Sequence, residues 1–246
     1  KRKGARVLSV VNVVGSSVAR ESDDVFYTWA GPEISVASTK AYTTQLMCMY
    51  ILALYMGEAK GSISDEYYKK IISELKSTPG KLQAVLDRKG EVEALANIFY
   101  SRNDIFFIGR GLDSCVSYEG SLKLKEVSYI NSLAITAGEL KHGTIALVED
   151  DTLIFALASQ DFLFEKMLSN IEEVKTRGAR VVGIAKKNQN AIQSKADEVI
   201  FIPDCADEIT PLLTVVPLQL FAYYVAKRRG TNVDKPKNLA KSVTVE

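Results

Sequence analysis

Lys123 and Glu126 are a pair of residues whose types and spacing could do chemistry. They lie three positions apart in segment 112–130, which has the composition of a long helix. A spacing of three places both side chains on one face of such a helix. The pair is therefore either a surface ion pair or a carboxylate base supported by a cation, and the spacing alone leaves both interpretations open.

His142 is the only histidine in the sequence, and it lies in the glycine-bounded segment 137–143, AGELKHG, which we expect to be a loop. Imidazole titrates near neutral pH, so a histidine is a natural proton shuttle, although many single loop histidines have no such role. Because the sequence has no second histidine and no cluster of acidic residues, no metal site is expected.

Two loops lie where ligands commonly bind in α/β proteins. Segment 31–40, GPEISVASTK, precedes a predicted helix, and Ser38 is placed to be the N-cap of that helix. Helix N-termini also bind anions and hydroxyl-rich ligands. Segment 109–111, GRG, follows a predicted strand but lacks the full G-x-G-x-x-G fingerprint, so a nucleotide site is not expected.

The composition excludes several classes of protein. Hydrophobic residues make up 47% of the 246 residues and charged residues 25%, and 31 basic against 30 acidic side chains leave a net charge of +1. This balance gives no electrostatic reason to bind nucleic acid or an acidic membrane surface. No run reaches the roughly 18 apolar residues of a membrane span, so we expect a soluble, cytoplasmic protein.

The cysteine usage also favours a cytoplasmic protein. They are three in number and form no C-x-x-C pair, so neither a disulfide framework nor a structural zinc site is expected. Free thiols in a reducing cytosol are the interpretation that this usage favours.

An internal repeat organises the elements that must position these residues. Segment 1–7, KRKGARV, matches segment 175–181, KTRGARV, at an offset of 174 (175 minus 1). The same offset, without a gap, pairs further residues: Asp23 with Asp197, Val25 with Val199, Gln45 with Gln219, Leu46 with Leu220 and Tyr50 with Tyr224. Matches that stay in register over about fifty residues indicate a duplicated structure.

Each copy has the pattern strand, helix, strand, helix, which favours a parallel sheet with helices on both faces. The predicted strands are 5–13 and 24–29 in the first copy and 179–185 and 198–203 in the second, and the long helices are 38–56 and 209–227. The second copy is preceded by predicted strands 104–109 and 152–158 and by predicted helices 112–130 and 162–176. The fold class is therefore α/β, with parallel sheets in a three-layer αβα arrangement.

The first copy has no counterpart of these preceding elements, so we expect a truncated chain whose first domain lacks its front half. The predicted division is 1–57 for the rear half of the first domain, 58–92 for a helical connector, 93–229 for the second domain and 230–246 for a tail. We expect the connector to be a helical hairpin with a break at 78–80, TPG, because proline and glycine interrupt helices.

Three groups of motifs carry a resemblance to one family. They are GPEI at 31–34 with VASTKA at 36–41, LKLKE at 122–126 with AGELKHG at 137–143, and KNLAKSVTVE at 237–246. Together they are similar to the sugar-isomerising half of the glucosamine-6-phosphate synthases, which consists of two sugar-isomerase (SIS) domains. The resemblance runs the whole length of the chain, and its tail is the most specific part because SIS proteins in general lack it.

The resemblance implies a ketose–aldose isomerase that also adds ammonia, converting fructose 6-phosphate to glucosamine 6-phosphate without a cofactor or metal. Lys241 matches a lysine that forms a Schiff base with the open-chain sugar. Glu126 matches a glutamate that moves a proton between C1 and C2, and Lys123 matches a supporting lysine. His142 matches a histidine from the neighbouring subunit that opens the sugar ring, which implies a homodimer. Four further residues match positions that hold or adjoin the sugar: Glu33, Val36, Ser38 and Ala240.

The sequence departs from the family pattern at three positions, where Lys237, Ser35 and Thr144 replace the usual arginine, glycine and proline. The serine-rich loop that holds the sugar phosphate in this family would precede Lys1, and segment 159–161, SQD, has too few donors to replace it. The glutamine-hydrolysing domain that supplies ammonia also lies outside the sequence. We therefore expect this chain alone to bind the sugar phosphate poorly and not to use glutamine.

Two rival functions share the fold. One is a related SIS enzyme that only isomerises sugar phosphates or cleaves fructosamine phosphates, and the family tail at 238–246 argues against it. The other is a non-catalytic SIS module that senses sugar phosphates and needs no base at Glu126.

Overall fold

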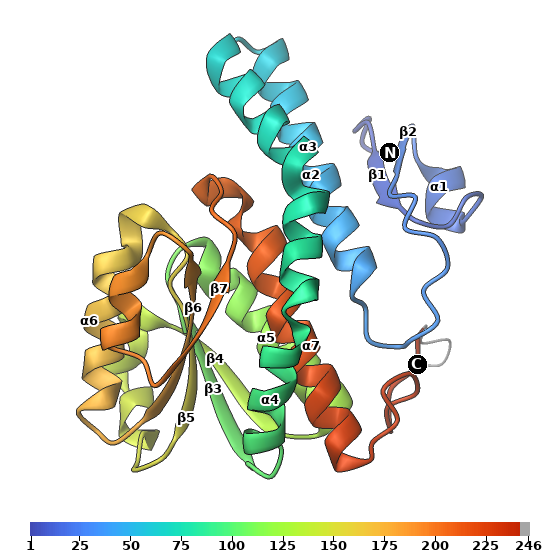
Figure 1. Cartoon of the computed structure of the whole chain (residues 1–246). Helices are drawn as coiled ribbons and strands as arrows, with labels where there is room; N and C mark the ends of the chain where they lie inside the picture. The colour runs from blue at the N-terminus through green and yellow to red at the C-terminus, as the bar shows by residue number, and fades with distance from the viewer. Residues whose placement is uncertain (242–246) are drawn as a thin grey trace. The chain divides into compact units, whose positions relative to one another are not determined.

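The computed structural model describes residues 1–241 and divides them into two compact units (Figure 1). The first unit holds Lys1–Ser73 together with Lys241, and the second holds Glu74–Ala240. The tail beyond 241, with the last five residues of its motif, lies outside the described residues. Parallel strands alternate with helices in both units, which confirms the α/β fold class.

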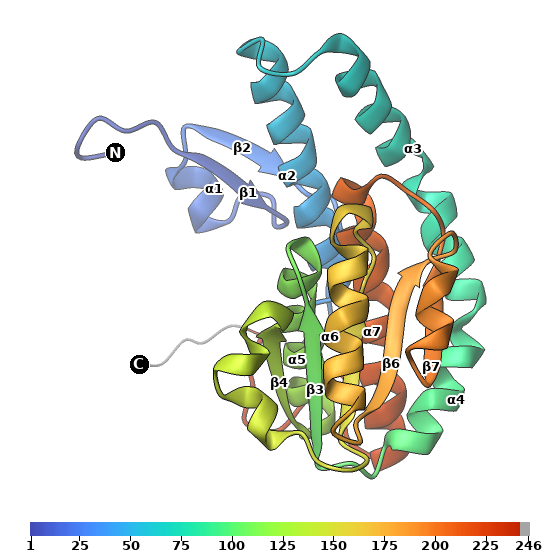
Figure 2. The same cartoon turned by 90° about the vertical axis from the view of Figure 1, so that its left-hand side faces the viewer.

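The second unit contains a five-stranded parallel sheet in the order β4-β3-β5-β6-β7. The strands are β3 (Asp104–Gly109), β4 (Asn131–Thr136), β5 (Leu153–Leu157), β6 (Arg180–Lys186) and β7 (Glu198–Ile202). The helices are α4 (Lys89–Phe99), α5 (Leu112–Ser128), α6 (Phe164–Lys175) and α7 (Thr210–Arg229). Helix α6 covers one face of the sheet, while α5 and α7 pack against each other on the other face (Figure 2).

The core of this unit lies where β5 and β6 meet the helices. All five residues of β5 are buried, as expected of a central parallel strand covered on both faces. The rings of Phe107, Phe155 and Phe221 continue this core from β3 through β5 to α7, with centroid separations of 5.2 and 4.6 Å. Segment Asp207–Arg229 has the length and apolar composition of a membrane span, but 72% of its apolar window is buried inside the protein. Its composition is therefore that of a core helix.

The first unit is smaller. Strands β1 (Leu8–Val11) and β2 (Asp24–Tyr27) form a parallel pair joined by the short helix α1 (Ser17–Glu21). Helix α2 (Lys40–Ala59) follows, and α3 (Asp65–Asp87) leads from this unit into the second. Among the described residues of α2 only Cys48 and Leu54 are buried, so this helix leaves most of its apolar side chains partly or fully exposed.

The sequence repeat is also a repeat of strand register. In the first unit Leu8 pairs with Asp24, and adding 174 to each number gives Val182 and Glu198, which pair in the second unit. The polar contacts that begin these strands repeat as well. Asp23 accepts a hydrogen bond from the backbone N–H of Val7 at 2.8 Å, and the corresponding distance from Asp197 to the N–H of Val181 is 2.7 Å.

The structure contains a strand that the sequence did not reveal. Strand β4 follows α5 directly, pairs with β3 on one side and forms an edge of the sheet. Its residues, NSLAIT, alternate partly between buried and exposed positions, because an edge strand is less enclosed than a central one. Without a continuous apolar run, the segment did not stand out from the polar residues before it. Segment 137–142, expected to be part of a loop, is a short 3₁₀ helix, η1.

The predicted break at 78–80 is wrong, because α3 runs unbroken through Pro79. A proline inside a helix removes one backbone hydrogen bond and normally costs about 3 kcal/mol. Here Leu75, Thr78 and Val85 are buried at helical spacing on both sides of the proline, while Pro79 itself is exposed. Packing of this continuous face outweighs the local preference for a break.

Replacing Pro79 by alanine should stabilise the protein by about 2–3 kcal/mol, because it restores a backbone N–H donor within a continuous helix. Gly80→Ala is the matched control, since a Cβ at this exposed helical position meets no atom within 4 Å. That control should add only about 0.5–1 kcal/mol. Thermal unfolding of both variants measures the difference, and equal or smaller gains for Pro79→Ala would mean that the helix is broken in solution.

Candidate active site

Lys123 and Glu126 form an ion pair on α5 in which the lysine is buried and the glutamate partly buried. The Lys123 side chain is 6% exposed, and its ammonium group hydrogen-bonds to the carboxylate of Glu126. A surface ion pair is therefore excluded, because a lysine this deeply buried requires compensating charge. The structure thus favours the interpretation of Glu126 as a carboxylate supported by a cation.

Glu119 supplies a second carboxylate to the ammonium group of Lys123, and it was not among the predicted site residues. Its Oε1 lies 3.6 Å from Lys123 Nζ, one helical turn before the lysine. Burial raises the pKa of Glu119, and the charge of Glu126 adds to this effect while Lys123 opposes it. The spacing of Glu119, Lys123 and Glu126 along one helix face was a signal that could have revealed the triad.

Lys241 is held in the first unit by three residues that the family resemblance associates with the sugar. Its Nζ lies 3.1 Å from Glu33 Oε2, 3.4 Å from the carbonyl oxygen of Val36 and 3.3 Å from Ser38 Oγ. Glu33, in turn, is 9% exposed. Hence residues more than 200 positions apart in the sequence meet around one amine.

The other oxygen of Glu33 is bound to the start of α2. Its Oε1 accepts hydrogen bonds from the backbone N–H groups of Thr39 at 2.9 Å and Ala41 at 3.3 Å. Burial alone would raise the pKa of Glu33, but the hydrogen bonds donated by Thr39, Lys241 and Ala41 outweigh it, so the pKa lies below its ordinary value. The carboxylate is therefore ionised at neutral pH and can hold a cation.

The sequence predicted Ser38 as the N-cap of α2, and this prediction is wrong. Thr39 is the N-cap but makes no side-chain capping bond. Glu33, six residues earlier in the sequence, accepts the N–H groups at the start of the helix instead. This arrangement frees the Ser38 hydroxyl to contact Lys241. The capping role was invisible to local reasoning, because Glu33 lies outside the usual N-cap window.

Asn12 positions this loop and was also missed. It directly follows β1, donates to the carbonyl oxygen of Gly31 at 2.8 Å and accepts from the backbone N–H of Ala30 at 3.0 Å. A polar residue at the carboxyl end of a parallel strand is a known signal for a site, and here it anchors the segment that leads into Glu33.

The remaining predicted residues stand apart from these contacts. His142 ends the 3₁₀ helix η1 with a side chain that is 75% exposed, and its Nε2 lies 3.8 Å from Glu139 Oε2. Ala240 is exposed and precedes Lys241. Glu126 also lines a cavity of about 420 Å³ together with other residues of α5 and the tail, among them Leu122, Lys125, Tyr129, Lys237 and Leu239.

The carboxyl edge of the five-stranded sheet, where parallel sheets usually bind ligands, is filled by the protein itself. Lys186, with 1% of its side chain exposed, lies 2.7 Å from Asp161 and 2.8 Å from Asp207. Asp113 accepts hydrogen bonds from the backbone N–H and hydroxyl of Ser159. The backbone N–H and hydroxyl donors of Ser159 are therefore engaged within the protein.

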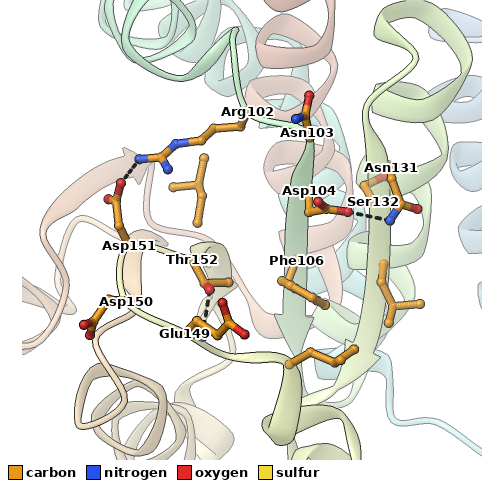
Figure 3. Close-up of a pocket in the computed structure, with 13 residues that line it drawn as sticks. Arg102, Asn103, Asp104, Phe106, Asn131, Ser132, Glu149, Asp150, Asp151 and Thr152 are labelled. Carbon is orange, nitrogen blue, oxygen red and sulfur yellow. Dashed lines mark hydrogen bonds and ion pairs between the residues drawn. The ribbon is translucent and has the colours of Figure 1, made fainter.

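A larger cavity of about 590 Å³ lies at the opposite edge of the same sheet (Figure 3). Its polar side chains pair with one another: Arg102 contacts Asp151, and Asn131 donates to Asp104 at 2.6 Å. Because this edge carries the amino ends of β3, β4 and β5, it is not where the fold usually places a ligand. The candidate functional residues are therefore Lys241 with its loop in the first unit and, separately, the α5 triad in the second unit.

Comparison with known proteins supplies an independent view of the chain. A family model described as the SIS domain matches residues 1–55 and 98–227. A glutamine–fructose-6-phosphate aminotransferase (isomerizing) from Caldanaerobacter subterraneus subsp. tengcongensis is 61% identical over all of this chain, and one from Clostridium tetani is 54% identical. The chain spans 40% of the length of each of these relatives.

Solved structures of related proteins also resemble this chain. The C-terminal domain of glucosamine-fructose-6-phosphate aminotransferase from Francisella tularensis matches 93% of this chain and 65% of its own, with a TM-score of 0.89 and 39% identity. A tagatose-6-phosphate ketose/aldose isomerase from Escherichia coli matches 97% of this chain and 63% of its own with a TM-score of 0.72, but at 18% identity it shows the fold alone.

Asp113 should give the stability of the protein a measurable pH dependence. Burial raises the pKa of its carboxyl to about 6, from an ordinary 3.8, although hydrogen bonds from Ser159 and Gln160 oppose the shift. A raised native pKa favours the folded state below pH 4, and this contribution, about 3 kcal/mol, is lost as the pH rises through 6. Urea unfolding of Asp113→Asn between pH 4 and 7 should show a flatter slope than the wild type, and identical slopes would contradict the assignment.

Proposed function

The chain belongs to the SIS-domain family, and from this membership we propose that it is the sugar-isomerising part of an enzyme that makes glucosamine 6-phosphate from fructose 6-phosphate and ammonia. The observation that carries the proposal is the position of Lys241, whose amine lies against Glu33, Val36 and Ser38. An amine held by sugar-binding positions is suited to form a Schiff base.

The proposed reaction begins with opening of the sugar ring, assisted by His142 as a proton carrier. Lys241, once it has lost its proton, attacks the C2 carbonyl carbon, and loss of water gives the Schiff base. Ammonia then adds to C2 and displaces the Lys241 amine, which leaves an imine on the sugar. Glu126 removes a proton from C1 and returns it to C2, while the C1 hydroxyl proton passes to the imine nitrogen, so that C1 becomes the aldehyde and the C2 imine becomes the C2 amine of an aldose.

In this scheme the remaining residues orient and stabilise Glu126, Lys241 and the sugar. Lys123 contacts the carboxylate of Glu126 and places a compensating positive charge beside it. Glu33 holds the tail lysine at the loop, and Val36 contributes its carbonyl oxygen. Ala240, beside Lys241, belongs to the positions proposed to border the sugar. No step draws on a cofactor or metal.

The proposal extends to partners outside this sequence. The relatives' name and length support a parent chain that carries a glutaminase part as its source of ammonia. The exposed His142 is free to serve a neighbouring subunit, so a homodimer is the proposed active unit. We further propose a cytoplasmic location, which the three free cysteines of the described residues favour.

Trapping with borohydride tests the nucleophile. When the full-length enzyme is mixed with fructose 6-phosphate and borohydride, the reduced adduct should map by mass spectrometry to the peptide that contains Lys241. Lys241→Arg retains a cation for Glu33 but cannot form the Schiff base, so its adduct should disappear. The matched control Lys235→Arg, at an exposed tail position, should leave the adduct unchanged. An adduct on another peptide would overturn the assignment.

Replacing Glu126 by glutamine separates the base from the nucleophile. This isosteric change should lower the rate of glucosamine 6-phosphate formation by about 10²–10⁴-fold, because the amide cannot accept the proton from C1. The borohydride adduct should persist, since Lys241 is intact. An unchanged rate in a steady-state assay would reject Glu126 as the base and favour a non-catalytic, sugar-phosphate-sensing role.

A further inference from the structure

Tyr129 occupies a backbone conformation that tyrosine disfavours. It terminates α5, the helix of Glu126, with a φ of 62° in the left-handed region, and its N–H donates to the carbonyl oxygen of Lys125. Glycine and asparagine are the residues that usually end a helix in this way, because a bulky side chain with positive φ is strained. The position of Tyr129 therefore requires an explanation from its side chain.

The side chain of Tyr129 docks the chain segment that leads to Lys241. Its phenolic oxygen accepts a hydrogen bond from the backbone N–H of Lys237 at 2.8 Å. The ammonium group of Lys237 also lies 4.4 Å from the centroid of the same ring, within the range of a cation–π interaction. One aromatic side chain thus holds both the backbone and the side chain of one tail residue.

Other contacts bring the tail to this anchor. After α7 the hydroxyl of Thr231 donates to the carbonyl oxygen of Val127, the penultimate residue of α5, at 2.6 Å. Asn232 then accepts the N–H groups of Asp234 and Lys235 in a tight turn, and Pro236 is buried. The segment before Lys237 is therefore ordered against α5 rather than extended into solvent.

We infer that Tyr129 is a positioning residue that docks the tail on α5 and thereby delivers Lys241 to the substrate. This inference rests on the proposed function. Lys241 follows Lys237 by four residues, which span at most about 14 Å, so fixing Lys237 restricts the volume that the reactive amine can reach. The same anchor places the tail on the helix that carries Glu126, and both line one cavity.

The anchor is compatible with lysine at position 237, where the sequence departs from the arginine that is usual in the resembling family. The contact with Tyr129 uses a cation over an aromatic face and a backbone N–H, and neither requires the bidentate geometry of a guanidinium group. Lys237→Arg should accordingly preserve docking, because arginine also stacks on aromatic rings.

The test compares the rate of borohydride-trapped adduct formation on Lys241 in the full-length enzyme. Tyr129→Asn fits the left-handed backbone well but removes the ring and the phenol, so the melting temperature should be retained while trapping slows about tenfold. Tyr100→Leu is the matched control. It removes an aromatic ring that lies 5.4 Å from the guanidinium of Arg228, a residue of α7 rather than of the tail, and should leave trapping unchanged.

Each outcome has a defined meaning. Wild-type trapping at Lys241 with slower trapping in a stably folded Tyr129→Asn supports the inference, and equal trapping in both overturns it. If Tyr129→Asn unfolds, Tyr129→Phe and Lys237→Met decide. Each of these variants removes one of the two contacts, so each should slow trapping by a smaller factor than Tyr129→Asn does. Lys237→Arg should trap at the wild-type rate. Wild-type rates in both Tyr129→Phe and Lys237→Met would reject the anchor. Absence of an adduct in the wild type would instead refute the proposed function itself.

Discussion

The placement of Lys241 depends on the hydrogen bonds and the ion pair that the Glu33 carboxylate makes. One oxygen accepts the N–H groups at the start of α2, and the other receives the ammonium group of Lys241. A single side chain thus performs the capping of a helix and the capture of a distant lysine. Because the carboxylate is partly buried and ionised, loss of either partner would leave unsatisfied charge or unsatisfied N–H groups. The arrangement couples the fold of the loop to the placement of Lys241, the proposed nucleophile.

The duplicated parallel sheet shows how one backbone design can serve two purposes. Asp23 and Asp197 accept the N–H at the start of equivalent strands, and equivalent residues pair in the same register. In the second unit the carboxyl edge is closed by Lys186 between two carboxylates. Similar topology therefore carries the tail lysine in one unit and a self-satisfied polar network in the other.

Helix α5 concentrates charge where a purely structural helix would not. Burying Lys123 beside two glutamates costs desolvation energy that such pairs rarely recover, and removing one partner of a buried pair commonly costs about 3–5 kcal/mol. The same helix ends in the strained Tyr129, which receives the tail. Both features are unfavourable locally, and both involve the proposed base Glu126 or the tail; functional sites are where enzymes commonly retain such strain.

The sequence by itself determined the α/β class, the repeat and most strands and helices, because apolar runs and a fixed offset are local or periodic signals. It also singled out Lys123, Glu126 and the loop at Glu33 through their motifs. Only the tertiary structure decided that α3 continues through Pro79 and that an edge strand follows α5, since packing overrides local preference at both places. It alone showed that Glu33 rather than Ser38 holds the start of α2, and that Lys241 meets Glu33. Contacts across some 200 residues depend on how elements pack, and no local pattern encodes them.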